Sequence, residues 1–295
     1  MKYIILDLEW NTAFVKKTGS FLNEIIEVGA VMTDENFNVI DTFTQIIKPK
    51  CAKKLSSKVK KLTHIQNADL VNGKPFAQVM SSFKKWIGGG DNVICTWGDT
   101  DIRTLVDNFK LFTGANHIPF MKKYCNLQAY AQNAITPSLP HQPGLAHVAQ
   151  ELGINVDELE LHRALADCSL TVQCIQKLNN PKLLKTFIHT CDTEFYKKLF
   201  FKPKIISDIK NPLVDKREFF GNCPECNTPL TIQGDWIFKS SFFRAPHICE
   251  NCSKPYSVNL RFKLLFDELE IKKRIDLIVP KESVENEESP EEVTV

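Results

Sequence analysis

Residues 3 to 8 read YIILDL, an apolar run of the length expected for a buried β-strand. Two further apolar stretches, IIEVGAVMT from 25 to 33 and FNVIDTFTQII from 37 to 47, predict two more strands. The polar residues 34 to 36 between them are typical of a hairpin turn. The chain is therefore expected to open with a series of neighbouring strands.

Helical periodicity follows this strand series. Apolar residues recur at helical spacing from Phe76 to Ile87, and three glycines at 88 to 90 end the segment. NVICTW, from 92 to 97, predicts another strand. Further helices are expected over 102–112, 145–152 and 164–178. Strands in series, followed by strands that alternate with helices, predict an α/β fold with a ribonuclease H-like mixed sheet flanked by helices.

Length and charge set the limits for the rest of the chain. A chain of 295 residues can form one sizeable core and a small accessory module, so two domains are expected. The net charge is +2, but residues 181 to 279 carry 17 Lys and Arg against 12 Asp and Glu. Residues 280 to 295 carry 1 against 6. This balance is compatible with a polyanionic partner without indicating one by itself.

No run approaches the roughly 18 apolar residues that a membrane span requires, and the N-terminus lacks the pattern of a secretory signal. A soluble, cytoplasmic protein is therefore expected. In a reducing compartment, ten cysteines are better interpreted as thiols or metal ligands than as disulfides.

The first strand carries two carboxylates, Asp7 and Glu9, two positions apart. Strand alternation directs both side chains to one face, with their Cα atoms about 6.6 Å apart. Carboxylates at this spacing suit a pair of divalent cations about 4 Å apart, an arrangement that serves displacement at a phosphodiester. The same pattern also fits an ordinary exposed strand face, so the pair alone does not decide between the two.

A second stretch, CTWGDTDIRTL from 95 to 105, places a strand end at Trp97 and a helix start close behind it. Strand ends in α/β proteins are where catalytic residues gather. Asp99 or Asp101 in this stretch is a candidate, but either aspartate also suits the capping of free helical amides.

A third stretch, LHRALADCSLT from 161 to 171, holds His162 and Asp167. On one continuous helix these side chains would lie about 140° apart, so they converge better if His162 precedes the helix. An imidazole with a pKa near ~6.5 can accept a proton from water at neutral pH. An isolated surface histidine is the alternative interpretation.

Taken together, the order and spacing of these stretches resemble the DEDDh (DnaQ-like) exonuclease family over residues 1 to 180. The family's D-x-E matches the pair on the first strand, and its EIIEIGAV segment matches EIIEVGAV from 24 to 31. Its H-x-x-x-x-D motif falls on His162 and Asp167. The T-W-G-x-x-D form is similar to that of the KapD-like branch, which also includes eukaryotic exonucleases of histone messenger and small interfering RNAs. This spacing selects Asp101 over Asp99 as the counterpart of the family's second aspartate.

The resemblance implies a metal-dependent 3′-to-5′ exonuclease that hydrolyses single-stranded nucleic acid and releases nucleoside 5′-monophosphates. Asp7 would bridge two Mg²⁺ or Mn²⁺ ions, Glu9 and Asp167 would complete the nucleophile-side site, and Asp101 would hold the second ion through water. His162 would deprotonate the attacking water.

The T-W-G form favours RNA over DNA as substrate. Two alternatives stay open: a catalytically silent scaffold that binds nucleic acid, and an exonuclease that proofreads DNA synthesis.

Four residues near these motifs are candidates for substrate contact: Trp10, Thr63, His64 and Trp97. Trp10 stands where many relatives have a small or hydroxyl residue, whereas Thr63 and His64 fall where relatives carry a loop that lines the active site. A cluster of seven lysines precedes that loop, and it would serve either as a phosphate contact or as a solvated face. Its members are Lys48, Lys50, Lys53, Lys54, Lys58, Lys60 and Lys61.

Two C-x-x-C pairs, Cys223 with Cys226 and Cys249 with Cys252, are separated by the spacing of a zinc ribbon. Four thiolates leave no open coordination position, so one structural Zn²⁺ is expected, with the nearby His247 as a non-ligand. Aromatic and basic residues alternate between the pairs. They predict either nucleic-acid binding or a small core for the ribbon, and a protein partner is the third possibility. These residues are Trp236, Phe238, Lys239, Phe242, Phe243 and Arg244.

The predicted organisation has five parts. They are an exonuclease domain over 1–180, a helical connector over 181–220, a zinc ribbon over 221–266, an unassigned stretch over 267–280 and an acidic, disordered tail over 281–295.

Overall fold

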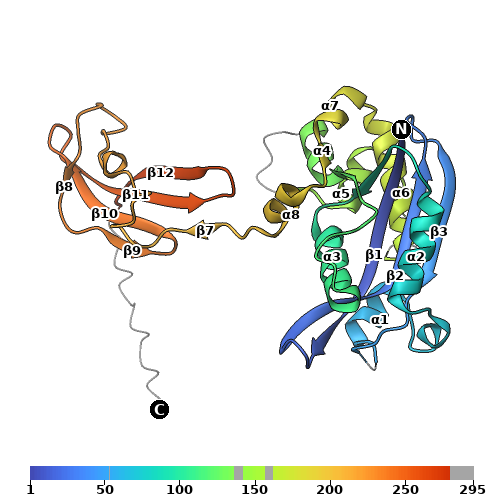
Figure 1. Cartoon of the computed structure of the whole chain (residues 1–295). Coiled ribbons are helices and arrows are strands. Elements are labelled where there is room, and N and C mark those ends of the chain that lie inside the picture. Colours follow the sequence, from blue (N-terminus) through green and yellow to red (C-terminus); the bar gives the residue numbers. More distant parts are fainter. Residues whose placement is uncertain (53, 136–141, 157–161, 280–295) are drawn as a thin grey trace, which may run out of the picture. The chain divides into compact units, whose positions relative to one another are not determined.

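The computed structural model describes residues 1–52, 54–135, 142–156 and 162–279. It divides into two compact units, Met1–Phe200 and Phe201–Val295 (Figure 1). Lys53 of the lysine cluster and the acidic tail predicted over 281–295 lie outside the described residues. Within the described ranges, no helix is both long and apolar enough to cross a membrane.

A mixed six-stranded sheet forms the centre of the first unit, in the order β3-β2-β1-β4-β5-β6. Its strands are β1 (Lys2–Val15), β2 (Ser20–Thr33), β3 (Val39–Ile46), β4 (Asn92–Thr96), β5 (Lys123–Asn126) and β6 (Ile188–Thr190). The first three pair antiparallel, β4 and β5 run parallel to β1, and β6 pairs antiparallel with β5. The predicted mixed α/β class is thereby confirmed.

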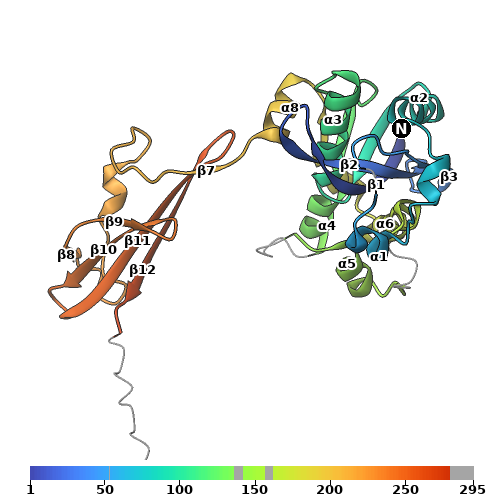
Figure 2. The same cartoon turned by 90° about the horizontal axis from the view of Figure 1, so that it is seen from below.

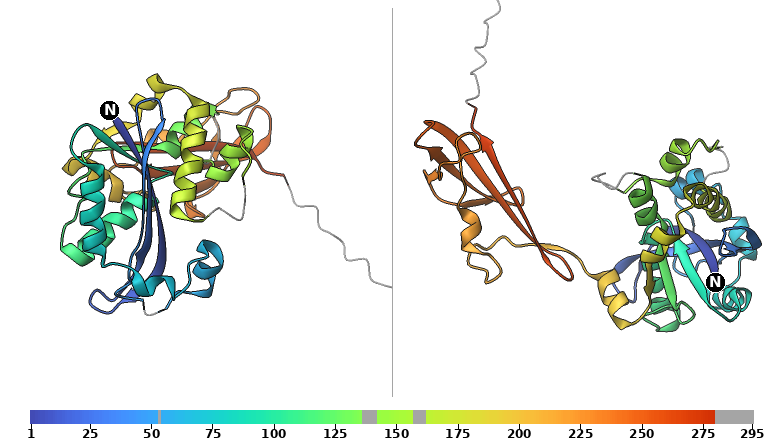
Figure 3. Two further views of the ribbon diagram at one scale, coloured as in Figure 1. Left: turned by 90° about the vertical axis from the view of Figure 1, so that its right-hand side faces the viewer. Right: turned by 90° about the horizontal axis from the view of Figure 1, so that it is seen from above.

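Helices cover both faces of this sheet, as Figure 2 and the left panel of Figure 3 show. They are α1 (Ser57–Thr63), the 3-10 turn η1 (Asp69–Asn72), α2 (Phe76–Ile87), α3 (Thr100–Thr113), α4 (Leu127–Ile135), α5 (Leu145–Glu151), α6 (Ala164–Leu178), α7 (Pro181–Thr186) and α8 (Thr193–Phe200). Ile4, Leu6 and Leu8 of β1 pack toward α2 and α3, whereas Tyr3 and Ile5 pack toward α4 and α6. Strand alternation thus gives each helical layer its own core.

The helices predicted over 76–87 and 164–178 are confirmed as α2 and α6 with the same bounds. The first two strands are longer than predicted, because β1 continues to Val15 and β2 already begins at Ser20. From Asn11 to Val15, buried and exposed side chains alternate instead of forming an apolar run. The prediction was based on the apolar run and therefore ended the strand too early.

The second unit is built on a sheet in the order β12-β11-β10-β8, with β7 paired to β11 and β9 paired to β10. Its elements are β7 (Lys204–Ile205), the 3-10 turn η2 (Lys216–Phe219), β8 (Thr231–Ile232), β9 (Ile237–Lys239), β10 (Phe242–Cys249), β11 (Lys254–Leu264) and β12 (Leu269–Leu277). Phe243, Leu260 and Phe262 form the core on one face of the sheet, beneath Ile206 and Val214 of the preceding segment.

The helical connector predicted over 181–220 is divided between the two units. Residues up to Phe200 belong to the first unit, because β6 pairs with β5 and Leu184 and Leu199 are buried in its cores. The following residues belong to the second unit, where β7 pairs with β11. The stretch 267–280, for which no structure is predicted, contains β12, which extends the second sheet past residue 266. The strands β6 and β7 are too short to leave a sequence pattern, and β12 is rich in charged residues, so neither difference was visible in the sequence.

Gly29 controls how closely α6 approaches the sheet. This glycine pairs with Asp7 across the β1–β2 ladder and lies directly under the start of α6. A Cβ at position 29 would stand 2.3 Å from the backbone of both Ala164 and Leu165. Only a residue without a side chain lets the helix pack at this distance.

Gly29→Ala is therefore expected to displace α6 and to destabilise the first unit by about 1–3 kcal/mol. Each kcal/mol should lower the melting temperature of a unit of this size by about 2–4 °C, measured by scanning calorimetry. Gly89→Ala is the matched control, because a Cβ there would meet nothing within 4 Å. Equal melting temperatures for the two variants would contradict this account of the packing.

Candidate active site

Three carboxylates meet where β1 passes under the first turn of α6. Asp7 and Glu9 lie on β1, and Asp167 lies in the first turn of α6. Each offers one oxygen atom, and these three atoms all lie within 4.8 Å of one another. Strand alternation thus places the first two on one face, and the close packing of α6 adds the third.

Asp101, in the first turn of α3, lies beside this group without being part of the three-residue cluster. Its carboxylate is only 6% exposed and accepts a hydrogen bond from the backbone N–H of Leu8, at 3.2 Å. Leu8 lies between the two carboxylates of β1. The hydrogen bond therefore holds Asp101 at the same stretch of strand.

Asp99 has a different role. Its Oδ1 accepts hydrogen bonds from the Tyr124 hydroxyl and from Nδ2 of Asn126, both at 2.9 Å. These contacts connect the start of α3 to β5, and they engage the Asp99 carboxylate in hydrogen bonds within the fold. The geometry accordingly separates the two aspartates between which the residue pattern alone left a choice, and it brings Asp101, the aspartate selected by the family resemblance, to the other carboxylates.

His162 lies directly before α6 in the left-handed region, with φ 66°, and its side chain is exposed. Its backbone hydrogen-bonds with the Asp167 carboxylate. The histidine thus precedes the helix, as the five-residue spacing from Asp167 required, and it stands next to the carboxylate cluster in contact with solvent.

Burial and mutual repulsion raise the pKa values of these carboxyl groups. Burial, reinforced by neighbouring carboxylates, raises the pKa of Asp7 well above its usual range and that of Glu9 to about 8. Burial raises the pKa of Asp101 to about 7, and it also raises that of Asp167. Four ionised groups cannot share this space without a countercharge. Oxygen ligands of this kind suit hard divalent cations such as Mg²⁺ or Mn²⁺.

An ion pair between a buried glutamate and a half-exposed arginine fixes the start of α6, and sequence reasoning missed it. Glu27 of β2 is 1% exposed, and its carboxylate accepts hydrogen bonds from Arg163 Nε at 3.1 Å and Arg163 Nη2 at 2.6 Å. It also accepts one from the backbone N–H of Ala164, at 3.3 Å. The available signal was a glutamate inside an apolar strand run, since a buried carboxylate needs a partner.

A second buried glutamate anchors the segment that carries the lysine cluster. Glu24 of β2 accepts hydrogen bonds from the backbone N–H groups of residues 50, 51 and 52, at 2.5 to 3.1 Å. Asn11 of β1 accepts a further one from the backbone N–H of Ser56, at 3.1 Å. These contacts hold the segment against the β1–β2 hairpin.

The four predicted substrate contacts are placed in different environments. Trp10 is half-buried against the first core, and His64 is exposed at the end of α1, with φ 59°. The Thr63 hydroxyl is buried and donates to the Val59 carbonyl. Trp97 donates its indole N–H to the carbonyl of residue 143, at 3.3 Å, and packs between two cores. Of these four residues, Trp10 and His64 are therefore the two whose side chains make no hydrogen bond within the described part of the chain.

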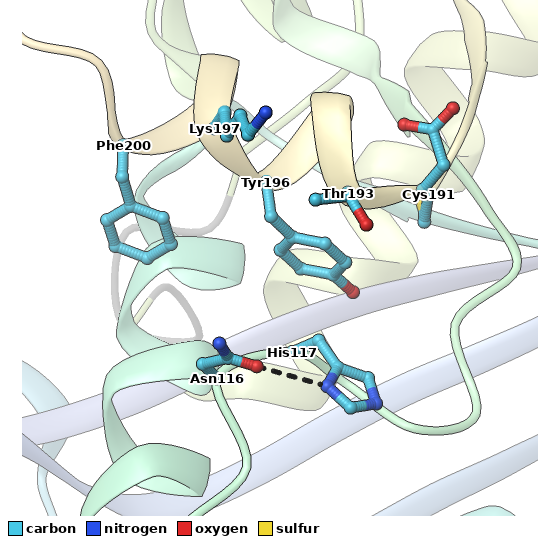
Figure 4. A pocket seen from close by; sticks show the side chains of 8 residues that line it. Asn116, His117, Cys191, Thr193, Tyr196, Lys197 and Phe200 are labelled. Carbon is cyan, nitrogen blue, oxygen red and sulfur yellow. Dashed lines mark hydrogen bonds between the residues drawn. The ribbon is translucent and has the colours of Figure 1, made fainter.

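A hollow of about 650 Å³ lies elsewhere on the first unit, between α8 and the chain that follows α3 (Figure 4). The Tyr196 ring reaches from α8 toward His117, whose Nδ1 lies 3.4 Å from Asn116 Oδ1. Burial raises the pKa of Cys191 to about 12, so this thiol is protonated at neutral pH. None of the four carboxylates lines the hollow, and it is not the candidate active site.

The four cysteines of the second unit converge as their spacing predicted. One sulfur from each lies within 4.8 Å of the others, with Cys226 and Cys249 3.4 Å apart and Cys223 and Cys252 4.0 Å apart. Sulfur atoms around a tetrahedral Zn²⁺ lie about 3.8 Å apart, from a Zn–S distance of about 2.3 Å. The cluster is therefore compatible with a zinc ribbon.

Local backbone turns aim these thiols inward. Asn227 and Ser253, each directly after a C-x-x-C pair, take the left-handed conformation with φ 59° and 53°. The Tyr256 hydroxyl lies 3.4 Å from the Cys223 sulfur. His247 instead places Nδ1 3.0 Å from the Ala245 carbonyl and is not part of the cluster.

Comparison with known proteins identifies the family to which this chain belongs. The exonuclease family model, RNase_T, matches residues 4–175. The probable 3′-5′ exonuclease KapD of Bacillus subtilis (strain 168) is 29% identical over 118 residues, which are 40% of this chain and 55% of that protein. The chain thus spans about half the length of that relative. The DNA polymerase III subunit epsilon of Treponema pallidum (strain Nichols) is 30% identical over 166 residues, covering 55% of this chain and 73% of that protein.

Solved structures agree on the fold. The nuclease domain of 3'hExo, a DEDDh family member, bound to rAMP, has a TM-score of 0.52 at 22% identity, covering 60% of this chain and 90% of that one. A 3′-exonuclease in a structure of 3′-end recognition of histone mRNA stem-loop has a TM-score of 0.53 at 19% identity, covering 65% and 71%. The family match spans all four carboxylates and His162, and the chain belongs to the exonuclease family.

Proposed function

We propose that this protein is a metal-dependent 3′-to-5′ exonuclease that hydrolyses single-stranded nucleic acid and releases nucleoside 5′-monophosphates. The observation that carries the proposal is the convergence of Asp7, Glu9 and Asp167 within 4.8 Å, with Asp101 held against the same strand. Buried acids whose pKa values are raised need cations to be ionised, and such a site suits phosphodiester chemistry.

In the proposed mechanism, Asp7, Glu9, Asp101 and Asp167 would hold two Mg²⁺ or Mn²⁺ ions. Bound there, such ions would supply positive charge to the oxygens on which negative charge develops. His162, exposed beside Asp167, would accept the proton of the attacking water, because an imidazole nitrogen can act as a general base. Glu27 and Arg163 position this histidine and Asp167 by fixing the start of α6.

The proposed substrate contacts are those predicted side chains that make no internal hydrogen bond. Trp10 and His64 are proposed to contact the terminal nucleotides, whereas Thr63 and Trp97 are proposed to shape the wall through their internal hydrogen bonds. The lysines carried by α1 are proposed to face phosphates, because α1 packs beside β1.

RNA is favoured over DNA as substrate. The T-W-G form supports this choice, and the similar solved structures include one that recognises a histone mRNA stem-loop. The similarity to DNA polymerase III subunit epsilon keeps DNA proofreading as the second candidate. The cytoplasm is the proposed location, since none of the ten cysteines, all of which the structure describes, is paired in a disulfide.

The second unit is proposed to bind one structural Zn²⁺ through Cys223, Cys226, Cys249 and Cys252. The four-thiolate set supports this assignment, because it suits tetrahedral zinc and leaves no position open for water.

The exonuclease proposal is tested with 5′-labelled single-stranded RNA and DNA oligonucleotides in Mg²⁺. Wild-type protein should produce a ladder that shortens from the 3′ end, and it should act faster on RNA. Asp7→Asn and Asp101→Asn should abolish the ladder, and His162→Ala should lower kcat by about 10²- to 10⁴-fold. Asp99→Asn is the control, because its carbonyl oxygen can still accept the bonds from β5.

Two outcomes would contradict this proposal. An inert wild-type protein that still binds the oligonucleotides would indicate a silent scaffold. A loss in Asp99→Asn as large as that in Asp101→Asn would contradict the assignment of the second aspartate.

The raised pKa values predict that the stability of the metal-free first unit depends on pH. Bound metal ions should remove this dependence. Protons bind the folded acids more tightly than the unfolded ones, so without metal the first unit should lose stability as pH rises from about 5 toward 8. The loss should extend through the folded pKa values of about 7 for Asp101 and about 8 for Glu9. Added Mg²⁺ should therefore raise the melting temperature more at about pH 8 than at about pH 6. Glu9→Gln should flatten this dependence, and an equal Mg²⁺ effect at both pH values would argue against a cation site.

The zinc proposal predicts one Zn²⁺ per chain by elemental analysis, with zinc lost in Cys223→Ser. Loss of a four-thiolate site should unfold the second unit, seen as loss of its separate melting transition. Cys174→Ser, which changes a cysteine of the first unit, is the control and should keep the zinc. Retention of stoichiometric zinc in Cys223→Ser would disprove the ligand assignment.

A further inference from the structure

The second unit has a sheet face that its core does not use. On β10, Phe243 points into the core, so Phe242 and Arg244 point to the opposite face. Pairing places Arg261 of β11 and Lys272 of β12 side by side on that face, with Arg274 two residues further along β12. Alternation on three neighbouring strands therefore gathers cationic side chains on one surface.

Three of these cations surround a single aromatic ring. The guanidinium carbons of Arg244, Arg261 and Arg274 lie 5.8, 5.4 and 4.8 Å from the centre of the Phe242 ring. That ring is 9% exposed, so the guanidinium groups cover it. Attraction to the ring face offsets part of the repulsion between the like charges. The arginines are thus held close together before any ligand arrives.

The carboxylates on this face neutralise few of these cations. Glu270 pairs with Arg261 at 2.8 Å, and Asp276 accepts a hydrogen bond from Asn259 at 2.9 Å. In the part of the chain that the structure describes, Arg244 and Arg274 have no ion pair. Unused guanidinium donors in a planar fork match the geometry of phosphate oxygens.

The aromatic residues between the cysteine pairs do not form a stacking surface on this face. Trp236 and Phe243 pack in the core on the other side of the sheet, against Phe219. Phe242 lies beneath the arginines. Of the two interpretations of this segment, its aromatic residues mainly form a core, and the basic residues alone remain for a ligand.

We propose that this arginine face, defined by Arg244, Arg261, Lys272 and Arg274, binds the phosphate backbone of single-stranded nucleic acid. It is a second binding site, separate from the carboxylates and without a catalytic step. The choice of nucleic acid over an acidic peptide rests on the proposed exonuclease function, because a linked second site raises the effective concentration of the same polyanion. Binding through phosphates requires no particular base sequence.

The test uses the full chain carrying Asp7→Asn, so that the oligonucleotide stays intact. Fluorescence anisotropy of a 5′-labelled oligothymidylate is followed over a range of salt concentrations. Lys272→Gln with Arg274→Gln removes two exposed cations and should weaken binding roughly 20-fold at about 0.1 M salt. The slope of log affinity against log salt should fall by about 1.4, from ~0.7 for each phosphate contact.

Two matched variants separate the arginine face from charge and folding effects. Lys210→Gln with Lys216→Gln removes the same charge from the segment that covers the opposite face, and it should leave binding unchanged. Lys272→Arg with Arg274→Lys keeps the charge and should retain binding. Zinc content, measured for each variant, shows whether the second unit is intact.

Binding by the Lys272→Gln, Arg274→Gln variant within twofold of the Asp7→Asn parent would overturn the proposal. Equal competition by a polyglutamate peptide of matched charge would also overturn it and would favour an acidic protein partner. Hydrolysis is measured separately, in the chain with Asp7 intact. If the protein binds through this face but does not hydrolyse nucleic acid, the proposed function is refuted and this inference still stands.

Discussion

The close packing of α6 against β2 is the constraint on which the catalytic arrangement depends. Gly29 removes the side chain that would keep the helix away, and the Glu27–Arg163 pair holds the end of the helix in place. Replacing Arg163 would leave the buried Glu27 carboxylate without its countercharge. Because Asp167 lies in the first turn of α6, this packing brings it to the two carboxylates of β1.

The opposite helical layer is attached to the same hairpin in a comparable way. The β1–β2 register shifts after Glu9, and β2 extends beyond its pairing with β3, which covers only residues 27 to 33, so backbone groups before residue 27 lack β3 partners on that side. Asn108 of α3 satisfies two of them, accepting from the Ile25 N–H at 3.2 Å and donating to the Asn23 carbonyl at 2.8 Å. Asp101, in the first turn of α3, bonds to Leu8. Both helices that bring a carboxylate are thus fixed to one irregular hairpin, so the carboxylates stay close although they repel each other.

The second unit shows a similar separation of structural and binding roles, by different means. A small core of aromatic residues lies on one face of the sheet, and the four-cysteine cluster lies at one end of it. Small domains commonly gain much of their stability from a structural metal, which is the role proposed for this cluster. With one face and one end of the sheet committed to structure, the arginine face is free to meet a ligand.

Much of the chemistry was predictable from the sequence, because it depends on local patterns. D-x-E on a strand, a histidine before a helix, and two C-x-x-C pairs each place side chains through the alternation of a strand or the geometry of a short turn. The mixed sheet and the helices α2 and α6 follow from hydrophobic periodicity. The resemblance to DEDDh exonucleases then selected Asp101, which the spacing of the residues alone could not do.

Contacts between residues distant in sequence were decided only by the tertiary structure. The division of roles between Asp99 and Asp101 depends on Tyr124 and Leu8, and the burial of Glu27 depends on Arg163, 136 residues away. The arginine face depends on the register of three strands. Sequence alone determined which chemical groups this protein has and their local order. Folding decided which of them are neutralised and which remain free, because burial and partner contacts arise only when distant segments pack together.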